Sequence, residues 1–117
     1  MENKALSLEV FKILDDKKGH DIKVLDVQGL TSIADYFIIA TGTSTKHASS
    51  LAESVEETLS DMGYEPSHKE GHRTGDWILL DYLDVIVHVF TNETREFYKL
   101  EKMWKDAEIL EVSVDTF

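Results

Sequence analysis

The sequence contains no cysteine among its 117 residues. This absence excludes disulfide bonds, cysteine nucleophiles and zinc sites built from thiolates. A single proline and six glycines leave little material for long flexible linkers. The length suits one ordinary domain. We therefore predict a single folded domain over residues 1–117, with a loosely held C-terminal tail at about residues 108–117.

Long apolar runs are also missing. No segment approaches the roughly 18 consecutive apolar residues that a membrane-spanning helix needs. The N-terminal segment contains Glu2 and Glu9 and so lacks the uninterrupted apolar stretch of a secretory signal peptide. We expect a cytoplasmic protein with no membrane segment.

Positive charge is scarce. The chain has 12 Lys and Arg residues against 23 Asp and Glu residues, which gives a formal net charge of -11. Such a surface repels phosphate backbones and attracts basic surfaces at long range. Direct nucleic-acid binding is therefore not expected. A basic protein is the more plausible partner, although acidity also serves solubility alone.

Two amphipathic helices are predicted from the spacing of apolar residues. The first lies before Gly19, which is expected to stop it, and the second runs from the hydroxyl-bearing residues 43–45 to a stop at Gly63. Thr91 or Asn92 is expected to cap a short third helix that continues through residues 97–104.

Strands are predicted between these helices. Residues 22–27 and 35–42 are β-prone, and the second run is continuous enough for a central strand that is buried on both faces. Residues 64–74 are predicted to be mostly loop, with room for a short edge strand. The order of elements indicates an α/β fold in which helices cover a mixed, mainly five-stranded sheet.

Residues 75–90 predict a β-hairpin whose two faces differ in chemistry. With Tyr82 and Leu83 as the turn, Trp77 would pair with His88. Alternation then places only aliphatic residues on one face. The other face carries Trp77, Leu79, Asp81, Asp84, Ile86 and His88. Such a mixture is typical of a protein-binding surface, and the alternative is that a terminal helix covers Trp77.

The sequence TGTS at residues 41–44 is a candidate anion site, because it joins a strand to the N-terminus of a helix. It lacks the second glycine and the lysine of phosphate-binding loops, so helix capping is the simpler interpretation. Asp81 and Asp84 offer two carboxylates for magnesium. In a hairpin turn, however, aspartates usually make local hydrogen bonds.

Histidines and serines supply two further candidates. His68, Glu70 and His72 have the side chains of metal ligands, and His88 could join them, but a loop does not hold them in one register. Ser44 and other serines of the second helix lack the nucleophile elbow of a hydrolase. We expect no catalytic residue, no metal and no cofactor.

Five segments together resemble the Iojap-like family of ribosomal silencing factors. They are VLDV from residue 24, ADYFIIATGTS at residues 34–44, EG at residues 70–71, DWILLDYLDVIVHVF at residues 76–90 and REFYKLEKMWKDA at residues 95–107. The resemblance covers most of the chain in order. It implies a fold similar to nucleotidyltransferases, without their catalytic aspartates and without enzyme activity.

The resemblance implies a translation regulator. Such a protein binds ribosomal protein L-fourteen of the large subunit and sterically blocks the small subunit, which represses translation under nutrient limitation. The family's recognition pattern falls on Glu70, Gly71, Trp77, Leu79, Asp81, Tyr82 and His88. Where the family usually has glycine this chain has Leu83, which adopts positive φ poorly, so a wider turn is an alternative to the two-residue turn.

Two alternatives stay open at this point. The first is a nucleotide-binding or nucleotidyltransferase-like enzyme that uses Ser44 with Asp81 and Asp84. The second is a self-associating module in which the exposed hairpin pairs two copies, so that a homodimer would use the same face as the ribosome.

Overall fold

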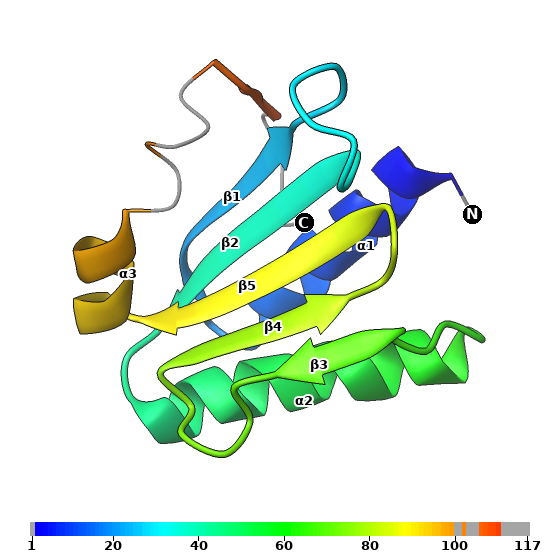
Figure 1. The fold of residues 1–117 in the computed structure, drawn as a ribbon. Coiled ribbons are helices and arrows are strands. Elements are labelled where there is room, and N and C mark those ends of the chain that lie inside the picture. The colour runs from blue at the N-terminus through cyan, green and yellow to red at the C-terminus, as the bar shows by residue number, and fades with distance from the viewer. Residues whose placement is uncertain (1, 100–101, 103–105, 111–117) are drawn as a thin grey trace, which may run out of the picture.

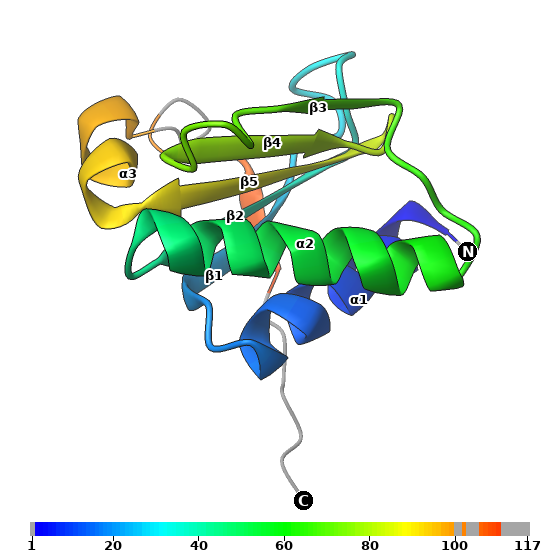
Figure 2. The ribbon, with the colours of Figure 1, turned by 90° about the horizontal axis from the view of Figure 1, so that it is seen from below.

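Two helices cover one face of a mixed β-sheet (Figures 1 and 2). The computed structural model describes residues 2–99, 102 and 106–110. These residues form a six-stranded sheet in the order β3-β4-β5-β2-β1-β6. Helices α1 (Asn3–Asp16) and α2 (Thr45–Asp61) contact each other on one face. The prediction of an α/β fold with helices covering a mixed sheet is confirmed.

Strands β2 (Tyr36–Gly42) and β5 (Val85–Thr91) form the centre of the sheet. They pair in parallel from Tyr36 opposite Val85 to Gly42 opposite Thr91. Every residue of β2 is buried, as expected for an apolar run with neighbours on both sides. Parallel strands require a crossover connection, and α2, β3 (His68–Glu70) and β4 (Trp77–Asp81) supply it.

The outer part of the sheet has one strand more than expected. Strand β1 (His20–Asp26) pairs with β2, and β6 (Glu108–Leu110) pairs with the other edge of β1. Residues 108–110 were assigned to the tail, but their main-chain groups find partners on an edge that would otherwise be unpaired. Residues 111–117 of the predicted tail lie outside the described residues.

The helix ends follow the capping signals closely. Ser44 Oγ accepts a hydrogen bond of 3.0 Å from the His47 N–H at the start of α2, and Gly63 has φ +93° after its end. At the end of α1, Lys18 rather than Gly19 has positive φ, at 64°. The Gly19 N–H bonds to the Leu14 carbonyl at 2.8 Å, and this closure holds the preceding residue in the left-handed conformation.

The third helix, α3 (Asn92–Tyr98), has Thr91, one of the two predicted capping residues, at its N-cap position, but the Thr91 side chain makes no capping hydrogen bond to the backbone. Lys99 is left-handed with φ 48°, so the helix does not continue without interruption through residues 97–104. Residues 100, 101 and 103–105 lie outside the described residues. Within the part of the chain that is described, no helix has both the length and the apolar character to cross a membrane.

The hairpin of β4 (Trp77–Asp81) and β5 has a different register from the predicted one. Trp77 lies opposite Phe90 rather than His88, and the turn residues are Leu83 and Asp84, because the Tyr82 N–H donates to the Val85 carbonyl at 2.9 Å. The alternative of a wider turn is therefore wrong: the turn has two residues, but it lies one position further along the chain than predicted. Leu83 adopts φ 74°, at a cost on the order of 1 kcal/mol. The predicted faces survive because the register shift is an even number of residues.

The cap of α2 is directly testable. Ser44→Ala should lower the free energy of unfolding by about 1 kcal/mol, because the His47 N–H loses its acceptor. Ser50→Ala, at an exposed position inside α2, is the control and should leave stability unchanged or slightly higher. Urea denaturation followed by circular dichroism measures both, and equal stability of the two variants would show that the cap contributes nothing.

Candidate functional site

The candidate site lies on the face of the sheet that is turned away from α1 and α2, which we call the distal face. It has its own cluster of buried residues, which are Leu25, Val27, Ala34, Phe37, Ile39, Ile86 and Phe90. Trp77 and Leu79 pack against this cluster and are half-buried. Among the described residues, α3 packs on β5 and β2 at one end, and Ala107 packs against the cluster.

The sheet register brings most of the predicted partner-binding residues together. Glu70, at the end of β3 (His68–Glu70), lies opposite Leu79, and Leu79 lies opposite His88. Directly opposed residues of antiparallel strands share a face, and Trp77 and Asp81 flank Leu79 on that face by alternation. Exposure falls from Glu70 at the edge to half-buried Leu79 and to His88, which is only 5% exposed. The accessible part of the distal face is therefore its β3–β4 edge.

Trp77 is held in a defined orientation. Its indole N–H donates to His88 Nδ1 at 3.1 Å, and its ring lies against Phe90 with 4.9 Å between centroids. Burial lowers the pKa of His88 from 6.5 to about 4. The imidazole is thus neutral near pH 7, and because Nδ1 accepts, its proton is on Nε2. His88 acts on Trp77 as an acceptor, not as a charged group.

His88 is more deeply buried than the sequence indicated. The sequence predicts His88 among the partner-binding residues, but β5 is a central strand and residues on both its faces are covered. Among the described residues, its Nε2 is buried and has no hydrogen-bond partner. A buried donor without a hydrogen-bond partner lowers the free energy of unfolding by about 1–3 kcal/mol. The role that the geometry supports for His88 is to position Trp77.

Gly71 also acts through Trp77. It has φ +85°, and a Cβ at this position would lie 1.8 Å from the Trp77 carbonyl oxygen. Any side chain here would therefore have to displace the start of β4. The Gly75 N–H donates to the Gly71 carbonyl at 2.9 Å and closes the loop between them.

The structure places Tyr82 away from the other predicted partner-binding residues. It follows Asp81 by one residue, so alternation turns it to the helix-covered face, where it packs in the main core. Burial, and then the negative charges of Glu56 and Glu65, raise the pKa of the Tyr82 hydroxyl above its usual value. Alternation along the strand was a signal that could have separated Tyr82 from Leu79 and Asp81.

Asp81 makes the local hydrogen bond that its place beside the turn predicted. Its carboxylate accepts the Leu83 N–H at 2.7 Å. Asp84, the other aspartate considered for magnesium, is exposed, and its carbonyl accepts the Asp35 N–H at 2.8 Å. The two aspartates thus organise the turn and its connection to β2.

The histidine candidates for a metal site point to different partners. His68 Nε2 is 3.4 Å from the Glu70 carboxylate, whereas His72 Nε2 is 3.4 Å from the Glu56 carboxylate on α2. Among the described residues, no group of three or more His, Asp or Glu side chains is arranged to hold a metal ion.

Backbone amides of the TGTS turn and of the start of α2 form hydrogen bonds within the protein. The Thr43 N–H donates to His47 Nδ1 at 2.9 Å, and the Ala48 N–H donates to the Ser44 carbonyl at 2.9 Å. With the cap from Ser44 to the His47 N–H, the amides of Thr43, His47 and Ala48 all have acceptors within the protein. The interpretation of this turn as a helix cap is confirmed.

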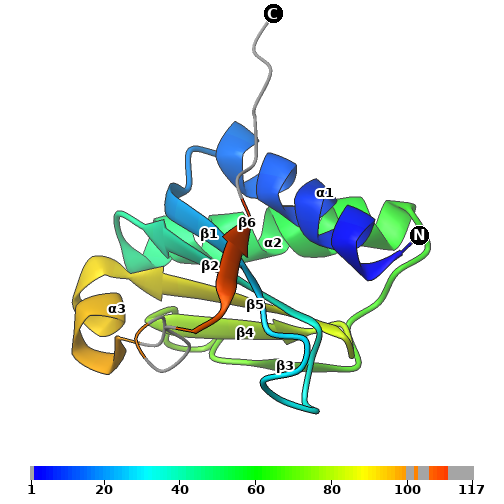
Figure 3. The same cartoon turned by 90° about the horizontal axis from the view of Figure 1, so that it is seen from above.

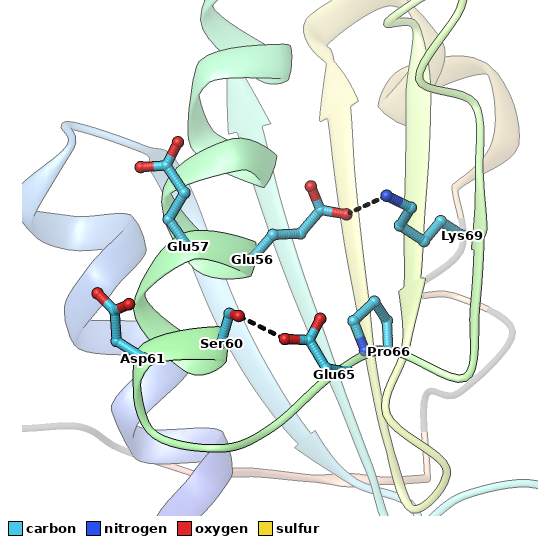
Figure 4. A pocket seen from close by; sticks show the side chains of 7 residues that line it. All are labelled: Glu56, Glu57, Ser60, Asp61, Glu65, Pro66 and Lys69. Atoms are coloured by element: carbon cyan, nitrogen blue, oxygen red, sulfur yellow. Dashed lines mark hydrogen bonds and ion pairs between the residues drawn. The ribbon is translucent and has the colours of Figure 1, made fainter.

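A groove of about 610 Å³ lies between α2 and the segment leading into β3 (Figure 4). It is lined by Glu56, Glu57, Ser60, Asp61, Glu65, Pro66 and Lys69. Lys69 Nζ is 3.2 Å from Glu56, and Ser60 donates a hydrogen bond to Glu65. With four carboxylates and one lysine, this groove repels the phosphates of a nucleotide.

Arg95 has a role that the sequence pattern did not single out. It is 7% exposed, and its guanidinium donates to the Asp21 carbonyl at 2.6 Å and to Thr41 Oγ1 at 2.7 Å. It also lies 3.4 Å from the Asp21 carboxylate. These contacts tie α3 to β1 and β2 at the end of the distal face.

Comparison with known proteins identifies the family. The sequence profile of a family described as "Ribosomal silencing factor during starvation" matches residues 1–116. This chain belongs to that family. A ribosomal silencing factor of Haemophilus influenzae is 41% identical over 100 residues, which cover 86% of this chain and 98% of the relative. The corresponding protein of Halalkalibacterium halodurans is 36% identical over 112 residues, 96% of each chain.

The fold of this ribosomal silencing factor is shared with a solved structure. A crystal structure of a protein from Chromobacterium violaceum matches it with a TM-score of 0.87 and 36% sequence identity. The match covers 98% of this chain and 95% of that chain. The family expected from the five sequence segments is confirmed.

Substitution of Gly71 in this family member tests how Trp77 is positioned. Gly71→Ala should lower the free energy of unfolding by more than about 2 kcal/mol and shift the Trp77 indole N–H resonance, because the new Cβ collides with main chain. Gly63→Ala is the matched control, since Gly63 also has positive φ but nothing within 4 Å of its Cβ position. If both variants lose the same stability, the close approach of Gly71 to the Trp77 carbonyl does not explain the loss.

The buried histidine predicts a pH dependence of stability. The unfolded chain binds the His88 proton below about pH 6.5 and the folded chain only below about pH 4, so stability is complete above pH 6.5 and falls as the pH drops. The expected loss is about 2 kcal/mol between roughly pH 7 and pH 5. Urea denaturation across this range measures it. His88→Gln removes the titrating group, and an unchanged pH slope in this variant would contradict the assignment.

Proposed function

We propose that this chain is a cytoplasmic translation regulator that binds the large ribosomal subunit through ribosomal protein L-fourteen. By occupying that surface it sterically blocks the small subunit and represses translation under nutrient limitation. The observation that carries the proposal is the β3–β4 edge of the distal face, where apolar and acidic side chains are presented together. Membership of the silencing-factor family supports it independently.

The chemistry of this edge suits a basic protein partner. Trp77 and Leu79 offer half-buried apolar contact. Glu70, opposite Leu79 on β3, and Asp81, two residues along β4, add negative charge. An apolar centre with a charged rim is the usual anatomy of a specific interface. Lysine and arginine side chains of the partner would pair with the two carboxylates.

Preorganisation supports the same face. The indole of Trp77 is already oriented by its hydrogen bond to His88 and by the ring of Phe90. A side chain that is ordered before binding loses little conformational entropy on binding. In this proposal Trp77, Leu79, Asp81 and Glu70 contact the partner, while Gly71 and His88 hold Trp77 in place and Tyr82 supports the hairpin from the core.

Occlusion requires no chemical step, which agrees with the helix-capping role of the TGTS turn and with the acidic groove. The attraction is partly long-range, because the net charge is -11. Association with large subunits should therefore slow as salt rises. An ATP-binding enzyme would release heat in calorimetry with ATP and magnesium, and a homodimer through the distal face would appear in light scattering.

A charge-reversal pair tests the proposed surface. Glu70→Lys should weaken binding to purified large subunits about tenfold, because it places a repelling charge against a basic partner. Glu57→Lys is the matched control: it lies exposed on α2, makes the same change in net charge, and should bind nearly as the wild type does. Co-sedimentation measures the affinity of each variant for large subunits. Light scattering measures how strongly each variant prevents the small subunit from joining the large subunit.

The comparison of the two variants decides the result. A loss confined to Glu70→Lys supports the distal face. Equal losses would mean that only total charge matters, and wild-type binding by Glu70→Lys would remove this edge from the interface.

A further inference from the structure

Leu83 combines backbone strain with exposure. Its φ of 74° lies in the left-handed region, and its side chain is 66% exposed. Among the described residues, the other non-glycine residues with positive φ are Lys18, Asp21 and Lys99, all of them charged. A leucine in this conformation is unfavourable, and glycine or asparagine would adopt it more readily. A side chain that is mostly exposed contributes little to the core, so folding does not explain the leucine.

Hydrogen bonds fix the backbone of the turn at Leu83. The Leu83 N–H is bound by the Asp81 carboxylate at 2.7 Å, and the Tyr82 N–H donates to the Val85 carbonyl at 2.9 Å. Both strands that flank the turn belong to the sheet. Leu83 is therefore presented to solvent in a fixed position at the end of the hairpin.

A second segment with exposed apolar residues lies beside the turn. The Asp35 and Tyr36 N–H groups donate to the Asp84 carbonyl at 2.8 and 3.1 Å, which joins loop 28–35 to the turn. This loop carries Leu30 and Ile33, which are 47% and 66% exposed. It stands on the side of the sheet away from α1 and α2 (Figures 2 and 3). The loop and the turn thus continue the distal face at the end where Asp81 lies.

The charges around these residues indicate what would cover them. Asp81 and Asp84 flank Leu83, and Asp35 is bound to the turn. Exposed apolar side chains among carboxylates match a basic surface with an apolar depression. A second copy of the chain would bring the same acids and the same charge of -11 against them, so electrostatic repulsion opposes self-association.

We propose that the Leu83–Asp84 turn and loop 28–35 form a second part of the interface with the basic ribosomal protein, with Leu83 and Ile33 as its apolar anchors. This inference rests on the proposed function and deepens it. The strain at Leu83 is retained because its side chain contributes to recognition. The interface is then L-shaped, with one arm along the β3–β4 edge and the other across the hairpin end.

Leu83→Asn separates recognition from folding. Asparagine adopts positive φ more readily than leucine, so the melting temperature Tm should stay the same or rise. Affinity for purified large subunits should fall about tenfold, because an apolar anchor is lost. Leu83→Met keeps an apolar side chain and should bind like the wild type. Met62→Asn is the control and should keep wild-type affinity. Met62 follows the last residue of α2 and is 38% exposed.

Ile33→Ser provides a second variant on a different segment and should also weaken binding. Wild-type affinity in both Leu83→Asn and Ile33→Ser would overturn the inference. It would also be overturned if light scattering showed a wild-type dimer that Leu83→Asn converts to a monomer, since a second copy would then be the occupant.

Trp77→Ala distinguishes two negative outcomes, namely that the hairpin end does not bind the partner and that the proposed function itself is wrong. If Trp77→Ala loses binding while the Leu83 and Ile33 variants keep it, the β3–β4 edge stands and the second arm does not. If all of these variants and Glu70→Lys bind normally, the distal face as a whole is not the ribosome-binding surface.

Discussion

The parallel pairing of β2 with β5 is the constraint on which the rest of the structure depends. Parallel neighbours cannot be joined by a tight turn, so the chain leaves the sheet through α2 and returns through β3 and β4. With α1 beside α2, both long helices cover the same face. The distal face is thereby left with a smaller buried cluster and an accessible edge.

The gradient of burial across the distal face gives each residue its role. At the centre, His88 is neutral and buried, and serves Trp77 as a hydrogen-bond acceptor. At the edge, Glu70 is exposed and is suited to meet a partner. Gly71 contributes through the space it leaves for the Trp77 carbonyl. Under the proposed function, residues 70–88 contain contact residues, positioning residues and a backbone requirement, and the residue types alone do not distinguish them.

Much of this arrangement followed from local patterns. Apolar spacing and capping residues located α1 and α2, the continuous β-prone run located β2, and alternation separated the faces of the hairpin. The register did not follow, because it depends on whether Leu83 accepts positive φ, and the Asp81 carboxylate that stabilises the turn decides this. Strand β6 also escaped prediction, since a three-residue strand forms only where an edge such as that of β1 is available.

The sequence by itself determined the fold class, the family and the acidic, apolar character of the hairpin, because these depend on residue type and periodicity. Only the tertiary structure decided which residues are accessible. His88 is buried because β5 lies at the centre of the sheet. The turn that carries Leu83 is joined to the loop that carries Ile33 by the bonds of the Asp35 and Tyr36 N–H groups to the Asp84 carbonyl. Accessibility depends on contacts between segments distant in sequence, and a local pattern does not contain them.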